Sequence, residues 1–140
     1  MKAFTIGYGG RAPDELIKLL LSAGVATVAD VRLRPDRASM GAFVKAKSPD
    51  KGIETLLAKA GIGYRSLPEL GNVFLEYEDW QKRYAELMKS AGHLLTTRLA
   101  GLPPPLCLLC AEKSVANCHR RQIAEFLTSH GWEIEHLDGA

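Results

Sequence analysis

Residues 105–131 read PLCLLCAEKSVANCHRRQIAEFLTSHG and carry the clearest strand, loop and helix signals of the chain. The apolar run at residues 106–110 is short and continuous, which is typical of a strand buried on both faces of a parallel sheet. After a polar loop, Asn117 is a residue type that caps helices, and apolar residues then recur at helical spacing before Gly131. This stretch predicts a buried strand followed by an amphipathic helix, the repeating unit of an α/β fold.

The rest of the chain repeats this alternation. Further strands are expected at residues 4–7, 25–31, 62–67 and 132–137, and helices at 13–23, at 49–60 behind a Ser48 cap, and in two pieces around 77–88 and 94–99, separated near Gly92. Strands separated by helices favour a parallel sheet with helices on both faces. We therefore predict one α/β domain over residues 1–140, a three-layer Rossmann-like fold with a mainly parallel sheet of about five strands.

Composition and charge narrow the class of protein. The chain has 140 residues, of which 46% are hydrophobic, and this suits one folded domain with a sizeable core. Lys and Arg exceed Asp and Glu by 18 − 16 = 2, too little to indicate nucleic-acid binding from bulk charge. The sequence has neither a signal-peptide pattern nor an apolar run of the roughly 20 residues that a membrane span needs. We expect a cytoplasmic protein with no membrane partner and with its three cysteines reduced.

Several polar residues directly follow expected strands. Ligands of parallel sheets bind beyond the carboxyl ends of the strands, where such residues meet. The candidate substrate-binding residues at this edge are Gly7, Tyr8, Gly9, Asp30, Arg32, Arg34 and Arg120. Arginines suit a phosphate or a carboxylate, and the start of the last helix would add unpaired N–H groups. For Asp30 and Arg32, which share a strand face, a plain ion pair is the competing interpretation.

Two thiols with neighbouring acid–base groups make the candidate catalytic set. Its members are Cys110, Glu112, Cys118, His119 and Glu69. Cys118 stands at an expected helix start beside His119 and Arg120, an environment that lowers the pKa of a thiol, so Cys118 is a candidate nucleophile with His119 as its base. The two carboxylates are candidates for moving a proton. The competing interpretation is that the thiols are buried and inert and that the carboxylates orient arginines.

Three other patterns suggest different chemistry. Cys110, Cys118 and His119 could ligate zinc, although no second ligand pair is evident. Cys107 and Cys110 have redox or zinc spacing, but residues three apart on a strand point to opposite faces, so Cys107 is expected to be a small buried hydrophobe. Residues 7–12 fit the glycine-rich fingerprint of dinucleotide-binding folds, yet Pro13 removes an N–H that a pyrophosphate would use.

The order of these motifs also carries a family resemblance. Residues 5–9 (TIGYG), 30–35 (DVRLRP), 67–71 (LPELG), 110–112 (CAE) and 118–120 (CHR) follow one another as in the uncharacterised family called domain of unknown function 488, which the chain resembles over nearly its whole length. The resemblance implies a compact α/β fold and a polar pocket built from these motifs. It implies no particular activity, substrate or cofactor.

The leading functional prediction is a small enzyme, or enzyme-like domain, acting on a phosphate-bearing or otherwise anionic substrate such as a nucleotide or a nucleic-acid component. A hydrolase or transferase with a reactive cysteine fits the residues, whether or not the chain proves catalytic. The alternatives are a non-catalytic nucleic-acid or nucleotide-binding module, with Arg32, Arg34, Arg37, Arg120 and Arg121 as a basic rim, and a zinc-binding protein. The cofactor is unknown. Tyr77, Trp80 and Tyr84 would suit the interface of a homodimer as well as a core.

Overall fold

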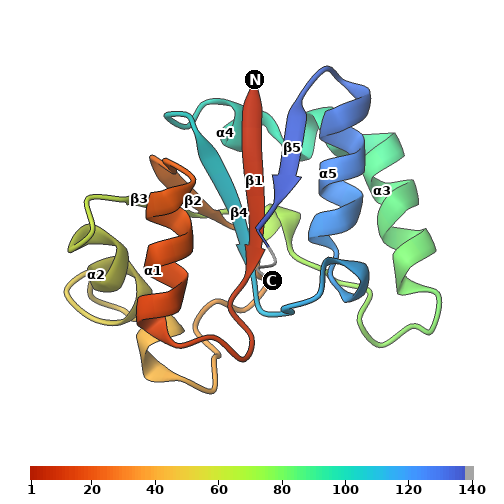
Figure 1. Ribbon diagram of the computed structural model, residues 1–140. Helices are drawn as coiled ribbons and strands as arrows, with labels where there is room; N and C mark the ends of the chain where they lie inside the picture. Colours follow the sequence, from red (N-terminus) through yellow and green to blue (C-terminus); the bar gives the residue numbers. More distant parts are fainter. Residues whose placement is uncertain (138–140) are drawn as a thin grey trace.

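The computed structural model describes residues 1–137 and shows each strand separated from the next by one or two helices (Figure 1). The strands are β1 (Lys2–Gly7), β2 (Thr27–Asp30), β3 (Gly63–Ser66), β4 (Leu106–Cys110) and β5 (Glu133–His136). The helices are α1 (Pro13–Ser22), α2 (Gly52–Ala58), α3 (Trp80–Leu95), α4 (Thr97–Ala100) and α5 (Arg120–Ser129). All four strand pairings are parallel, and the sheet has the order β3-β2-β4-β1-β5. The prediction of a three-layer α/β fold is confirmed.

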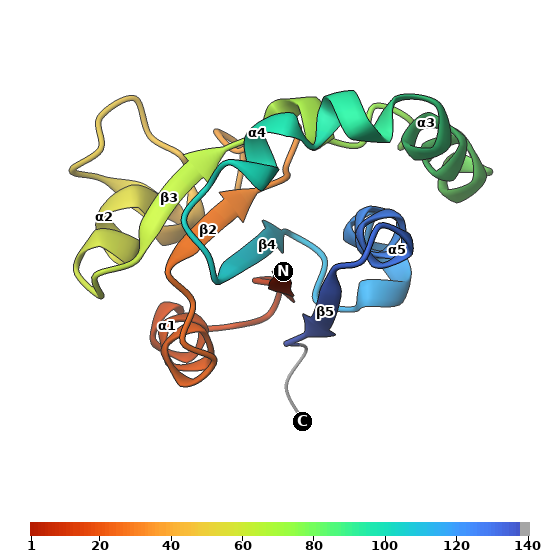
Figure 2. The same cartoon turned by 90° about the horizontal axis from the view of Figure 1, so that it is seen from above.

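Helices cover both faces of the sheet, as the view from above shows (Figure 2). α1 and α2 lie on one side, and α3, α4 and α5 lie on the other. The central strand β4 is buried along its whole length and alternates between the two layers. Cys107 and Leu109 pack with α1 and α2, whereas Leu106, Leu108 and Cys110 pack with α3 and α5. Because β4 needs apolar side chains on both faces, its sequence is a continuous apolar run.

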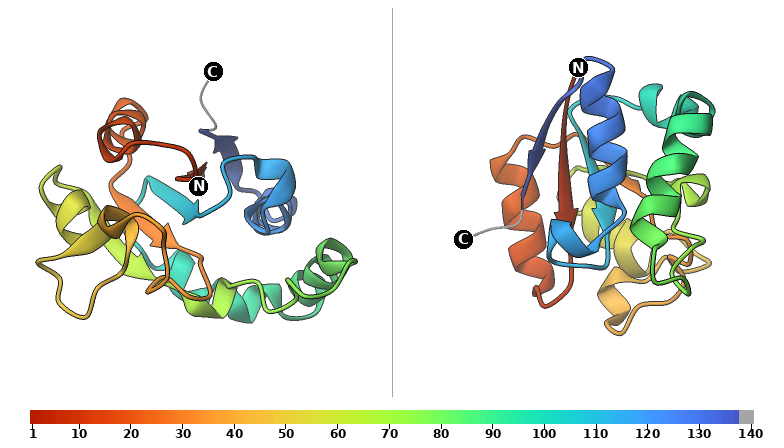
Figure 3. Two further views of the ribbon diagram at one scale, coloured as in Figure 1. Left: turned by 90° about the horizontal axis from the view of Figure 1, so that it is seen from below. Right: turned by 90° about the vertical axis from the view of Figure 1, so that its right-hand side faces the viewer.

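The order in which strands are added to the sheet changes direction at β4. The chain passes from β1 through α1 to β2 and β3, and then returns to insert β4 between β1 and β2. The segments that follow β1 and β2 lead to α1 and α2, while the segment after β4 leads to α5 in the opposite layer. A crevice opens where connections diverge in this way. Figure 3 (left) views the molecule from this carboxyl edge of the sheet.

The helix near Gly92 differs from its prediction. α3 runs without a break from Trp80 to Leu95, so Gly92 lies inside it and does not end it. A Cβ atom at Gly92 would lie 2.4 Å from the Phe126 ring on α5. The glycine is therefore explained by close packing of α3 on α5, which a one-residue helix-stop signal does not distinguish.

The starts of two other helices were also predicted wrongly. α2 begins at Gly52, not behind Ser48, because Gly52 adopts a φ of 67° and its missing Cβ lets the backbone approach the Val44 carbonyl. α5 begins at Arg120 with His119 as the preceding residue, and Asn117 belongs to a short 3-10 turn at Val115–Asn117. In residues 1–137, no helix has the length and apolar character that crossing a bilayer requires.

Candidate functional site

A pocket of about 220 Å³ opens at the carboxyl edge of the sheet. Its walls come from the segments that follow β1, β2, β3 and β4, the last of which includes the residues just before α5. Of the residues predicted from sequence, Tyr8, Arg32, Arg34, Cys110, Glu112, Cys118 and His119 line it. Leu33, Arg37, Asn72, Leu75, Ala111 and Asn117 complete the lining. The structure thus brings together side chains from all of the expected loops.

Arg32 is fixed at the base of the pocket by a buried ion pair. Its guanidinium Nε and Nη2 donate to the two oxygens of Asp30 at 2.9 and 2.7 Å, and its Nη1 donates to the Phe43 carbonyl at 2.8 Å. Tyr64 donates its hydroxyl to the same carboxylate. Burial opposes the charge of Arg32, but the hydrogen bonds and charge of Asp30 outweigh it and raise the pKa of Arg32. Asp30 is fully buried, so it anchors Arg32.

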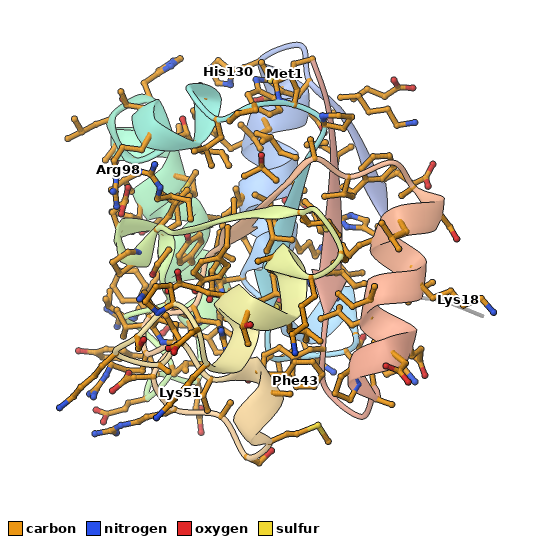
Figure 4. All side chains as sticks on the ribbon, turned by 90° about the vertical axis from the view of Figure 1, so that its left-hand side faces the viewer. Met1, Lys18, Phe43, Lys51, Arg98 and His130 are labelled. Carbon is orange, nitrogen blue, oxygen red and sulfur yellow. A yellow bond between two sulfur atoms is a disulfide. The ribbon has the colours of Figure 1, made fainter. Side chains whose placement is uncertain are left out.

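Phe43 marks the same end of the molecule. In Figure 4 it lies at the opposite end from Met1 and His130. The Tyr8 ring stacks on Phe43 with ring centroids 4.7 Å apart, and the Arg32 guanidinium lies 5.1 Å from the centroid of the Tyr8 ring. These contacts hold Tyr8 against the buried cation.

Arg34 and Arg37 lie on the long loop after β2, whose only helical element is a 3-10 turn at Gly41–Phe43. Both side chains are exposed, and Arg34 pairs with the equally exposed Asp36 at 3.1 Å. An exposed ion pair is weak because water screens it, so an arriving anion can compete with Asp36 for Arg34. The mouth of the pocket therefore carries cations that can reach a ligand, unlike Arg32.

Cys110 and Cys118 are joined in a disulfide inside the pocket wall. The prediction that all three cysteines stay reduced is wrong for this pair, because the loop between β4 and α5 folds back and brings two thiols from distant elements together. Each is only 2% exposed. Cys107 is a free, buried thiol on the other face of β4, and burial raises its pKa. The prediction that Cys107 is a small buried hydrophobe is confirmed, so Cys107 and Cys110 form no pair.

His119 stands behind Cys118 with both ring nitrogens engaged. Its Nε2 lies 2.8 Å from the Val31 carbonyl, and its Nδ1 lies 3.8 Å from Cys118 Sγ. A carbonyl can only accept, so Nε2 carries the proton, and in the neutral ring Nδ1 is left as an acceptor facing the sulfur. Burial lowers the pKa of His119, and backbone contacts at Val31 and Leu70 oppose this without outweighing it. The ring is therefore neutral near pH 7.

This burial makes stability depend on pH in a defined direction. Below the ordinary histidine pKa of 6.5, His119 binds a proton in the unfolded chain, whereas in the folded protein burial keeps it neutral until a lower pH. The free energy of unfolding should therefore fall as the pH drops from 6.5 to the lower folded value, by at most about 1.4 kcal/mol per pH unit. Urea unfolding of wild type and His119→Gln at about pH 7.5 and about pH 5.5 measures this. The exposed His93→Gln variant should keep the wild-type dependence, and an equal dependence in His119→Gln would contradict the assignment.

The glycine loop after β1 is packed tightly against the segment after β4. Tyr8 and Gly9 donate their backbone N–H groups to the carbonyls of Cys110 and Ala111 at 3.0 and 2.9 Å. A Cβ at Gly7 would overlap the Glu112 carbonyl, and one at Gly9 would lie 2.5 Å from the Ala111 carbonyl. The two glycines therefore permit close contact between two loops. The N–H groups of Tyr8 and Gly9, which a dinucleotide fingerprint would offer to phosphate, are used inside the protein.

Arg120 is fully buried beneath this loop. Its guanidinium donates to the Lys113 carbonyl at 2.8 Å, to the Glu112 carbonyl at 3.3 Å and to the Thr5 hydroxyl at 2.9 Å. Arg120 does not line the pocket, so the structure places it where it can position Glu112 but not where it can touch a ligand.

Glu69 lies outside the pocket. It accepts two hydrogen bonds from Arg98 on α4, at 2.8 and 2.7 Å, and these bonds hold its pKa below the usual range. Arg98 and Phe43 lie well apart in Figure 4, which places this ion pair away from the pocket floor. The structure therefore brings Glu112, but not Glu69, to the cysteines. Among residues 1–137, no three His, Cys, Asp or Glu side chains are grouped to hold a metal ion, so the zinc alternative gains no support.

Sequence reasoning missed the part of the lining that follows β3. Asn72 is 4% exposed and accepts the Phe74 N–H on its Oδ1, which turns the chain so that Leu75 faces the pocket. The sequence held one indication that Asn72 lies near the pocket, because Asn72 directly follows the Leu67–Gly71 motif. Leu33 and Leu75 are apolar but 39% and 68% exposed, and the sequence alone does not distinguish such residues from core.

Fold and pocket together define a small α/β protein with a hollow at the carboxyl edge of a parallel sheet. The chain belongs to the family described as "Domain of unknown function DUF488", whose sequence model matches residues 12–127. The resemblance seen in the motifs is thereby confirmed, although residues 5–9 lie outside the matched range. No curated protein and no solved structure matches the chain.

Proposed function

We propose that the protein is a cytoplasmic enzyme, a hydrolase or transferase, that acts on a small anionic substrate with Cys118 as its nucleophile. The observation that carries the proposal is the orientation of His119, whose Nδ1 faces Cys118 Sγ at 3.8 Å while Nε2 is held by Val31. A base fixed in one tautomer behind a thiol is the arrangement that nucleophilic catalysis by cysteine uses. The active form is the one in which the Cys110–Cys118 bond is reduced.

The first step moves one proton. When Cys118 is a thiol, its proton passes to His119 Nδ1, and the sulfur keeps the electron pair with which it attacks. The backbone N–H of Arg120 points at Cys118 Sγ at 3.4 Å, and it lies in the first turn of α5, where the helix dipole favours negative charge. The Arg120 N–H and the dipole of α5 both stabilise the thiolate of Cys118 more than its thiol.

The substrate anion is bound at the mouth. Arg34 and Arg37 are exposed there and line the same pocket as Cys118. Arg32 lines the base of the pocket but is buried and paired with Asp30, so it contributes little net charge to the anion. Guanidinium groups bind phosphate and carboxylate oxygens in pairs. The charge of Arg34 and Arg37 would hold an anionic substrate with its electrophilic atom toward the sulfur.

The shape of the pocket limits what the substrate can be. About 220 Å³ is less than the roughly 300–1,000 Å³ typical of pockets for drug-sized ligands, which favours a small molecule over a dinucleotide. Leu33 and Leu75 form an apolar wall beside the arginines. A phosphate or carboxylate carried by a compact apolar or planar group, such as a mononucleotide or a nucleic-acid component, matches both features.

Glu112 is the remaining acid–base group of the proposal. Its side chain is exposed at the pocket mouth, and its carbonyl is held by Arg120. There it can deliver a proton to a departing group or take one from the water that releases a thioester-like or thiophosphoryl intermediate. Glu69, paired with Arg98, has no place in this scheme.

The distribution of arginines favours this enzyme over a nucleic-acid-binding module. Such a module needs an exposed basic surface that follows the phosphate backbone. Arg32 and Arg120 are buried, and Arg121 pairs with Glu125 outside the pocket lining. Only Arg34 and Arg37 remain at the mouth, which suits one anionic group better than an extended chain of them.

Protection of Cys118 by inorganic phosphate tests the proposal. In the reduced protein, phosphate should slow alkylation of Cys118 by iodoacetamide in a saturable way, because an anion on Arg34 and Arg37 blocks the mouth. Protection should weaken about tenfold or more in Arg34→Ala/Arg37→Ala, as expected when charged hydrogen bonds are lost. Arg83→Ala, at an exposed position of α3, is the matched control. Equal alkylation rates in phosphate and in chloride of the same ionic strength would refute the anion site.

A further inference from the structure

We propose that Cys110 and Cys118 are a redox pair, in which a hydroperoxide oxidises Cys118 and Cys110 then closes the disulfide that shuts off the nucleophile. The inference rests on the proposed function in one respect, namely that Cys118 is the reactive thiol of the pocket. It adds a modification site and a means of regulation that the catalytic proposal does not require.

The positions of the two sulfurs are the first support. Cys110 ends the central strand β4, and Cys118 lies two residues before the first residue of α5, yet their Sγ atoms are bonded. Both side chains line the pocket where the substrate anion would bind. A disulfide that serves only stability has no need to occupy a pocket wall beside a histidine and arginines. When the disulfide forms, the Cys118 sulfur that faces His119 can no longer act as a nucleophile.

The contacts of the two sulfurs differ, and the difference assigns their roles. Cys118 Sγ is approached by the Arg120 N–H at 3.4 Å and by His119 Nδ1 at 3.8 Å. Cys110 Sγ lies 3.8 Å from the Glu112 carbonyl, which accepts a proton and therefore favours the thiol form. Cys118 is thus the thiol that reacts first, because the thiolate is the nucleophile. Cys110 is the thiol that then attacks the oxidised Cys118 sulfur and forms the disulfide.

The chemistry balances with a hydroperoxide as the oxidant. The Cys118 thiolate attacks the terminal peroxide oxygen, the O–O bond breaks, and the leaving alkoxide or hydroxide takes up a proton, which leaves Cys118 as a sulfenic acid. The Cys110 sulfur then attacks the Cys118 sulfur, the S–O bond breaks, and the departing hydroxide leaves as water with the Cys110 proton. An external dithiol restores both thiols by supplying two electrons and two protons, and becomes a disulfide itself.

The connection between the cysteines permits both states. Residues 111–114 and 116–117 are exposed, and the only element in this stretch is the 3-10 turn at Val115–Asn117. The Glu112 and Lys113 carbonyls are held by Arg120, and the Ala111 carbonyl by the Gly9 N–H. The part that can rearrange at low cost is therefore the largely exposed stretch at residues 114–117. β4 and α5, by contrast, are anchored by the core on either side. The thiols can separate or join while the arginines at the mouth stay in place, so oxidation should remove the nucleophile and leave anion binding intact.

The test treats the reduced full-length protein with about one equivalent of hydrogen peroxide and follows peptides by mass spectrometry. Wild type should form the Cys110–Cys118 peptide bridge, lose iodoacetamide labelling of Cys118, and regain it with dithiothreitol. Cys110→Ser should stop at a sulfenic acid that dimedone traps on Cys118, and Cys118→Ser should form neither product. Cys107→Ser, altered on the other face of β4, is the matched control and should behave as wild type.

Two outcomes overturn the inference and are distinguishable. If iodoacetamide labels Cys118 rapidly and phosphate protects it, but peroxide produces no bridge and no difference between wild type and Cys110→Ser, the redox pair is refuted while the proposed function stands. If Cys118 resists both reagents in the reduced, folded protein, both proposals fail together. Circular dichroism of each variant establishes that the fold is retained.

Discussion

Asp30→Asn should lower the free energy of unfolding by about 3–5 kcal/mol, the usual loss when one partner of a buried ion pair is removed. The substitution keeps the size of the side chain but leaves the Arg32 guanidinium buried without its counter-charge. Asp30 accepts from Arg32 side-chain and backbone donors and from Tyr64, so these bonds weaken together. Urea unfolding at pH 7, followed by fluorescence, measures the loss.

Two further variants separate charge burial from other causes. Asp36→Asn removes the partner of Arg34 in an exposed pair and should have the smallest effect, because solvent already screens that charge. Asp30→Asn/Arg32→Met should recover much of the lost stability, since it removes the uncompensated cation as well. A loss in Asp30→Asn no larger than that in Asp36→Asn would show that the buried pair does not hold the pocket floor.

The sequence was sufficient to predict the architecture. The apolar run at residues 106–110 coincides with β4, and Pro13 and Gly24 bracket α1, because a doubly covered sheet and helix ends leave strong local patterns. The location of the pocket could be predicted as well, since parallel strands deliver their following residues to one edge. Arg32, Arg34, Cys110, Glu112, Cys118 and His119 all line it.

The Asp30–Arg32 ion pair was one of the two interpretations that their shared strand face allowed, and the structure contains it. Other side-chain partners could not be predicted, since Glu69 pairs with Arg98 and Arg120 bonds to loop carbonyls. Each of these partners lies in another part of the fold or depends on the path of a loop, and a spacing rule contains no such information. The same holds for Gly7, whose neighbour is the Glu112 carbonyl.

The Cys110–Cys118 bond shows this limit most clearly. The sequence separation of 8 residues crosses from a strand into a helix start, and periodicity does not determine how the intervening loop folds. An odd number of cysteines and no secretory pattern favoured reduced thiols, which is an argument about compartment and not about geometry. Once the loop path is known, the two thiols and His119 form one group.

The largest functional effect is expected at His119. Replacing it with glutamine keeps a side chain that can donate to the Val31 carbonyl but removes the basic nitrogen that faces Cys118 Sγ, because an amide takes up no proton near pH 7. Alkylation of reduced Cys118 at pH 7 should then slow by about tenfold or more, because each unit of thiol pKa changes the thiolate fraction tenfold. His130→Gln, on an exposed helix end, should leave the rate unchanged.

The pH dependence of Cys118 alkylation in the reduced protein tests the central claim most directly. The account predicts an apparent thiol pKa clearly below the free value of about 8.5 in wild type and a return toward that value in His119→Gln. An apparent pKa at or above about 8.5 in wild type, unchanged by His119→Gln, would contradict the assignment of Cys118 as an activated nucleophile.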